Sequence, residues 1–70
     1  MNAKLLKYRL DERNKNLNEL ADCLGINVAT LYRKLNGTSD FTRSEIQQIR
    51  LFVPLSKEDI YSIFFANQLT

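Results

Sequence analysis

The stretch Leu17–Gly37, LNELADCLGINVATLYRKLNG, decides the fold that this sequence predicts. Leu20, Ala21 and Leu24 fall on one face of a first short helix at helical spacing. The small side chain of Ala21 lets a second helix approach closely at a steep angle. Gly25 follows the last apolar residue, where a helix commonly ends in a left-handed conformation that glycine adopts without steric cost. The first half therefore predicts a helix that stops in a tight turn.

The second half of the stretch has the pattern of another short helix. Ile26 fills the corner, and Asn27 is a suitable N-cap. Leu31 and Leu35, four residues apart, form a stripe for burial, and Gly37 ends the helix. Two helices joined in this way predict a helix-turn-helix motif, in which the second helix lies in the major groove of DNA.

Apolar stripes and capping pairs on both sides of the motif predict three further helices, joined by loops of about three to five residues. The first spans about residues 2–13, with a stripe of Ala3, Leu6 and Leu10. Pro54 ends the fourth helix. In a capping box, an N-cap side chain and the side chain three residues later exchange hydrogen bonds with each other's backbone. The expected boxes are Asn16 with Glu19, Thr42 with Glu45, and Ser56 with Asp59.

Seventy residues predict one domain, 1–70, with a single core, since a chain this short buries only about 60% of its unfolded surface. Hydrophobic residues make up 44% and charged residues 26%, as in soluble globular proteins. The lack of histidine and the single cysteine, Cys23, argue against zinc binding and against Ser-His or Cys-His catalysis. No apolar run reaches the length of a signal peptide or a membrane span. We therefore expect an intracellular, non-enzymatic protein without cofactor, metal, membrane contact or small-molecule ligand.

The charges are distributed unevenly along the chain. Residues 1–50 hold nine Lys or Arg against six Asp or Glu, whereas residues 51–70 hold one Lys against two acids, which accounts for the net charge of +2. The excess of positive charge thus lies with the motif and the helix before it. This predicts that one side of the domain faces phosphates and the other faces a partner.

Beyond these patterns, the sequence resembles the lambda-type phage repressor and Cro superfamily, also called the XRE family. The segment LADCLGINVATLYRKLNG resembles the helix-turn-helix of that family. The segments FTRSEIQQI, LSKEDI and IFFANQLT are similar to its small phage and prophage regulators, so the resemblance covers nearly the whole chain. The dipeptide Asn36-Gly37 matches a frequent Asn-Gly at the end of the recognition helix. The family's motif positions hold Leu20, Ala21, Leu24, Gly25, Ile26 and Leu31.

The resemblance implies an all-α, compact five-helix lambda-repressor-like DNA-binding domain, with the helix-turn-helix at the second and third helices. It also implies binding to double-stranded operator DNA as a homodimer, and a Cro-like or repressor-like switch role in the cytoplasm of a bacterial host cell. By this resemblance we expect a Cro-sized regulator without the second domain of the larger repressors. Two positions depart from the family: Leu17 replaces a frequent Gln, and Lys34 stands where an apolar side chain is common, with Leu35 taking over the packing.

Four residues of the second motif helix are candidates for base contacts. Arg33 can donate two hydrogen bonds to guanine O6 and N7, and Tyr32 can stack on or hydrogen-bond to a base. Val28 and Ala29 lie at the helix start, which normally points into the groove, and can contact a thymine methyl group. The alternatives are phosphate pairing for Arg33 and packing on the domain surface for Tyr32.

Candidates for phosphate contacts flank the groove at the starts of both motif helices and after the end of the second. Solvated residues would show the same pattern, and capping is the simpler role for Asn27. Lys4, Lys7 and Lys15 are expected to form a solvated face that adds to the salt dependence of DNA binding. The phosphate candidates are Asn18, Asn27, Asn36, Thr38 and Arg43.

Phe64 and Phe65 are candidates for a dimer interface within a possible contact segment, residues 55–70, because a core of this size hardly accommodates four phenylalanines. The alternative is that both close the core against the first helix. The sequence thus predicts a homodimeric, sequence-specific regulator of transcription, acting as a repressor. A protein-interaction module with the same fold, such as an antirepressor or modulator, is the alternative function.

Overall fold

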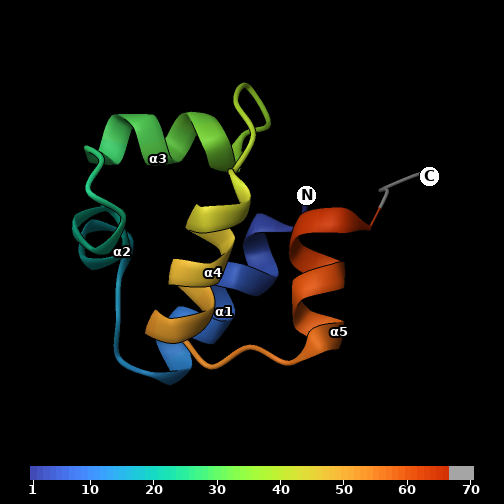
Figure 1. The fold of residues 1–70 in the computed structure, drawn as a ribbon. Helices are drawn as coiled ribbons and strands as arrows, with labels where there is room; N and C mark the ends of the chain where they lie inside the picture. Colours follow the sequence, from blue (N-terminus) through green and yellow to red (C-terminus); the bar gives the residue numbers. More distant parts are fainter. Residues whose placement is uncertain (67–70) are drawn as a thin grey trace.

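A computed structural model of the chain describes residues 1–66, which form five α-helices and one π-helical turn (Figure 1). No strand occurs within this range. The all-α, five-helix fold class predicted from the sequence is therefore confirmed. The elements are α1 (Ala3–Glu12), α2 (Leu17–Leu24), α3 (Val28–Leu35), α4 (Arg43–Phe52), α5 (Lys57–Ile60) and the π-helix η1 (Tyr61–Phe65).

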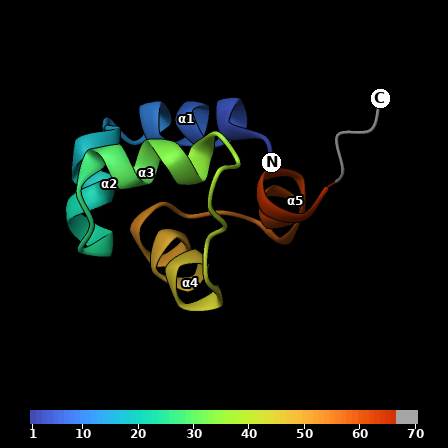
Figure 2. The same ribbon diagram turned by 90° about the horizontal axis from the view of Figure 1, so that it is seen from above.

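The helices are arranged so that α3 runs along one edge of the domain, at the top of Figure 1. Helix α2 packs against both α3 and α4, and α1 packs against η1. In both views α2 and η1 lie on opposite sides of the molecule (Figures 1 and 2). The backbone N–H of Asn2 donates to the carbonyl oxygen of Ile63 at 2.9 Å, which joins the start of the chain to η1. The other helices thus form a support from which α3 projects at one edge.

The core is aliphatic and draws on most of the helices. Leu31 and Leu35 of α3 belong to it, as the stripe predicted, and so does Ala21 of α2, which is buried. None of the four phenylalanines is among the buried residues of the core. Phe41, Phe52 and Phe64 are half-buried, and Phe65 is 61% exposed. The side chains with no more than 1% exposure are Leu6, Leu10, Leu20, Leu31, Ile49, Val53 and Ile63.

All three predicted capping boxes are confirmed, and each fixes a helix start. The backbone N–H of Thr42 donates to Glu45 Oε1 at 2.9 Å, and the Glu45 N–H donates to Thr42 Oγ1 at 3.1 Å. Asn16 with Glu19, and Ser56 with Asp59, repeat this exchange. Because the first N–H groups of a helix have no partner within it, these side chains satisfy donors that would otherwise need water.

Three features differ from the sequence-based expectation. Helix α1 begins after Asn2, whose side chain accepts from the Leu5 N–H at 3.1 Å and so acts as a cap outside the helix. The connection between α3 and α4, residues 36–42, is longer than the expected three to five residues. The last helix widens into a π-turn, closed by the Ala66 N–H donating to the carbonyl oxygen of Tyr61 at 2.7 Å. Such turns are rare within helices, and no pattern in the sequence predicted this one.

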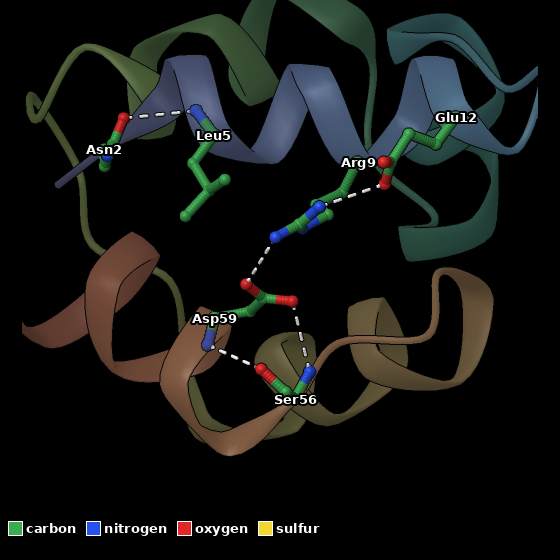
Figure 3. Close-up of polar contacts among 6 residues, drawn as sticks. All are labelled: Asn2, Leu5, Arg9, Glu12, Ser56 and Asp59. Atoms are coloured by element: carbon green, nitrogen blue, oxygen red, sulfur yellow. Dashed lines mark hydrogen bonds and ion pairs between the residues drawn. The ribbon is translucent and has the colours of Figure 1, made fainter.

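A polar bridge joins α1 to the start of α5, as Figure 3 shows. Arg9 Nη2 donates to Asp59 Oδ1 at 3.1 Å, and Arg9 Nη1 donates to Glu12 Oε1 at the same distance. The second oxygen of Asp59 accepts from the backbone N–H of Ser56 at 3.2 Å. Asp59, the partner of Ser56 in the capping box of α5, therefore also ties this helix to α1.

Candidate nucleic-acid interface

The turn between α2 and α3 sets the direction of α3. Gly25 adopts φ +72°, the left-handed conformation predicted for it, and its N–H donates to the carbonyl oxygens of Ala21 and Asp22. Asn27 then caps α3, since its side chain accepts from the Thr30 N–H at 2.8 Å. Local hydrogen bonds at Gly25 and Asn27 thus end one helix and start the next, and this produces the predicted helix-turn-helix geometry.

One face of α3 is exposed along its length. Ala29, Tyr32 and Arg33 are exposed, with 46% of Tyr32 accessible, while Leu31 and Leu35 face the core. Tyr32 and Arg33 lie three and four residues after Ala29, so each of these base candidates shares a face of the helix with it. The fourth, Val28, is half-buried and packs against the core, so only part of its surface faces outward.

The five phosphate candidates are all exposed and lie around α3. Asn18 is the second residue of α2, and Arg43 is the first residue of α4. Asn36 is the C-cap of α3, and Thr38 lies in the loop that follows, which stands clear of the helices on the same side as α3 (Figure 1). Asn27 has its side-chain oxygen engaged in the cap, as its simpler role predicted.

A shallow groove next to Tyr32 brings together residues from the first three helices. It has a volume of about 420 Å³, and Lys7, Lys15 and Asn18 line it together with Tyr32. Sequence reasoning assigned the two lysines to a solvated face, and nothing in the sequence indicated that Lys7 lines the same groove as Tyr32. Lys7 of α1 therefore adds positive charge beside the exposed face of α3. The half-buried Leu17, where the family often has Gln, lines the same groove and packs against the core.

Two arginines on this side of the domain make no ion pair with the described residues. Within residues 1–66, the ion pairs are Arg9 with Glu12, Arg9 with Asp59, and Lys34 with Glu45. Arg33 and Arg43 take part in none of them. Their guanidinium groups are therefore available to bases or phosphates without first losing an intramolecular partner.

Lys34, one of the two departures from the family pattern, points into the domain. Its Nζ lies 3.1 Å from Glu45 Oε1 and donates to the carbonyl oxygen of Asp40 at 2.9 Å. Its side chain is only 12% exposed. Burial acts to raise the pKa of Glu45, but hydrogen bonds from the Thr42 N–H and from Lys34 outweigh it, so the pKa of Glu45 lies below its ordinary value. No signal in the sequence linked these residues.

The two phenylalanines expected at a dimer interface have different environments. Phe64 is half-buried and meets the edge of Phe41, with ring centres 5.4 Å apart. Phe65 is 61% exposed and borders a groove of about 390 Å³ that Phe41, Ile46 and Phe64 also line. Residues 67–70 of the expected contact segment lie outside the described residues.

Comparison with known families agrees with this geometry. Residues 5–61 match the family model of the Cro/C1-type HTH DNA-binding domain, and the chain belongs to that family. The match extends from α1 to the start of η1 and so includes the whole motif. No curated protein and no solved structure gives a significant match to the chain. Among the described residues, none of the helices has the length and apolar character needed to cross a membrane.

Proposed function

We propose that this Cro/C1-type DNA-binding protein recognises a specific operator through the exposed face of α3 and represses transcription by occupying a promoter. The observation that carries the proposal is that the short helix α3 has one exposed face and one buried face. Tyr32 and Arg33 are exposed, while Leu31 and Leu35 are buried. The stripe holds the helix in place, while the opposite face offers a bidentate donor and an aromatic ring. These are the groups suited to reading base edges in the major groove.

In this proposal the base contacts come from Val28, Ala29, Tyr32 and Arg33. Phosphate contacts come from exposed residues on both sides of the groove, and fix the register in which α3 meets the bases. Lys7 contributes charge without sequence preference. The proposed phosphate contacts are Asn18, Asn27, Asn36, Thr38 and Arg43.

We further infer that the protein binds as a homodimer, as a Cro-like phage regulator would. Phe65 is a large apolar side chain in solvent, and beside it lies a groove lined by Phe41 and Phe64. A two-fold interface uses the same patch on both copies, so a projecting side chain next to a groove is self-complementary. Two such copies would place their α3 helices in successive major grooves, about 34 Å apart.

A binding-site selection followed by fluorescence titration tests this function. The selected sites are expected to be palindromic, and the affinity for them should exceed that for random DNA by at least about 10³-fold at moderate salt. Equal affinity for selected and random DNA would contradict sequence-specific recognition. Loss of DNA binding together with stoichiometric capture of a purified antirepressor-type partner would favour the protein-interaction module instead.

A further inference from the structure

We propose that Lys34 is a positioning residue for DNA recognition, which holds the recognition helix α3 and the following loop, residues 36–42, in one fixed arrangement. The inference rests on the proposed function, because it concerns how two sets of DNA contacts are kept in register. Lys34 itself has its ammonium group turned toward Asp40 and Glu45 rather than toward solvent.

The loop is tied to α3 along both of its halves. Its first half is held by backbone hydrogen bonds to Arg33, whose carbonyl oxygen accepts from the N–H of Thr38 at 2.9 Å and of Ser39 at 3.4 Å. Its second half is held through the side chain of Lys34, whose Nζ donates to the Asp40 carbonyl oxygen. A single side chain of α3 therefore fixes the part of the loop that leads into α4.

The start of α4 is joined to the end of α3 through the same lysine. Glu45 Oε1 accepts from the Thr42 N–H at 2.9 Å and lies 3.1 Å from Lys34 Nζ. Glu45, the partner of Thr42 in the capping box of α4, therefore also anchors the end of α3. The ammonium group is 5.7 Å from the centre of the Phe41 ring, within the range of a cation–π interaction. Both side chains of the ion pair are mostly buried, at 12% and 16% exposure, so solvent screens the pair less than it would a surface pair.

The orientation of α3 that these contacts hold also orients Arg33 toward DNA. Arg33 precedes Lys34 directly, so the two side chains point about 100° apart around the helix. A rotation of α3 that the Lys34 contacts now prevent would move Arg33 relative to Thr38 and Arg43. Base contacts and phosphate contacts must fit the same DNA at once. Losing the tie should therefore weaken binding to the specific site more than binding to random DNA.

Two variants remove the tie from either side, each with a matched control. Lys34→Met keeps an unbranched apolar stem and removes the charge, and Lys7→Met does the same for an exposed lysine beside the DNA face. Glu45→Gln keeps an oxygen that can accept from the Thr42 N–H. Glu19→Gln is its control, because Glu19 occupies the same position in the capping box of α2, accepts from the Asn16 N–H at 2.9 Å, and has no cationic partner within residues 1–66.

Affinities for the selected site and for random DNA are measured below the melting temperature of every variant. We expect Lys34→Met and Glu45→Gln each to lower the ratio of specific to random affinity by about tenfold, the size of one good base contact. For Glu45→Gln, simple electrostatics predicts a different result, because removing a negative charge should strengthen binding to the selected site and to random DNA alike. Glu19→Gln and Lys7→Met should leave the ratio unchanged.

Two outcomes would overturn the proposal. If Lys34→Met weakens both DNAs equally and lowers the salt slope by about one, Lys34 contacts a phosphate directly. If both variants keep the wild-type ratio, Lys34 serves stability alone. Amide hydrogen exchange without DNA tests the tie itself, and so separates a failure of this proposal from a failure of the proposed function. Exchange at Ser39 should quicken in Lys34→Met and Glu45→Gln but not in Glu19→Gln, whatever DNA the protein binds.

Discussion

At the scale of single residues, Asp59 shows how one carboxylate serves two structural purposes. One oxygen accepts from Arg9 Nη2 and the other from the Ser56 N–H (Figure 3). Burial acts to raise the pKa of Asp59, but these hydrogen bonds and the charge of Arg9 outweigh it, so the pKa lies below its ordinary value. The ionised form therefore stabilises the native state.

Replacing Asp59 by Asn tests this contribution, and we expect it to lower the free energy of unfolding at neutral pH. Because the native pKa lies below the unfolded one, the stabilisation is complete above the unfolded Asp pKa of about 3.9 and is lost as the pH falls through the native value. The free energy of unfolding of wild type and variant, measured with urea between about pH 2 and pH 6, should differ at the upper end of this range and converge in acid. Both proteins retain Glu45, so the difference isolates Asp59.

Glu58→Gln is the control for this titration, because Glu58 is exposed and takes part in no ion pair within residues 1–66. It should follow the wild-type curve across the acid range. A difference between wild type and Asp59→Asn that stays constant with pH would show that the amide loses packing or capping rather than charge.

At the scale of the elements, helix starts were predictable because capping is local. Each box joins residues three apart, so Thr42 and Glu45 carry the signal within one short segment. The contacts that position one helix against another were not predictable in this way. Lys34 meets Glu45 across a loop, and Arg9 meets Asp59 from 50 positions away. Their pairing depends on the completed fold and leaves no periodic pattern in the sequence.

The turn of the motif provides a second test, through Gly25→Ala. A methyl group at Gly25 would meet nothing within 4 Å, so the cost comes from the backbone conformation at φ +72° alone. We expect a loss of about 1–2 kcal/mol in the free energy of unfolding, measured by urea denaturation. Gly25→Asn is the matched variant and should lose less, because Asn tolerates the left-handed region better than Ala. Equal losses for both would point to a steric cause instead.

At the scale of the whole molecule, the aromatic residues show where sequence reasoning stops. The composition indicated that four phenylalanines exceed what the core can hold, and all four indeed lie outside the fully buried set. The sequence revealed neither the π-turn that carries Phe64 and Phe65 nor which of the two is exposed. The structure packs Phe64 against Phe41 and leaves Phe65 in solvent, so in the proposed interface Phe65 is the projecting side chain and Phe64 lines the groove.

Phe65→Ser tests the proposed dimer. Sedimentation equilibrium over a range of concentrations should show a weakened dimer, while the melting temperature of the domain changes little, because the Phe65 side chain is mostly exposed. The control is Leu51→Ser, a change at the 88% exposed Leu51 near the end of α4, which should leave association unchanged. Wild-type association in Phe65→Ser would place any interface elsewhere on the molecule.

The central claim is that α3 reads DNA sequence, and the most direct test compares Arg33→Ala with Lys7→Ala on every single-base variant of the selected site. Arg33→Ala should weaken the free energy of binding to the intact site by about 1–3 kcal/mol. It should also lose the preference for one base at one position of each half-site. Lys7→Ala should weaken binding to all sites alike and lower the salt slope by about one. If Arg33→Ala instead weakens all sites uniformly and keeps every base preference, Arg33 contacts only phosphate, and the account of recognition by this face of α3 is wrong.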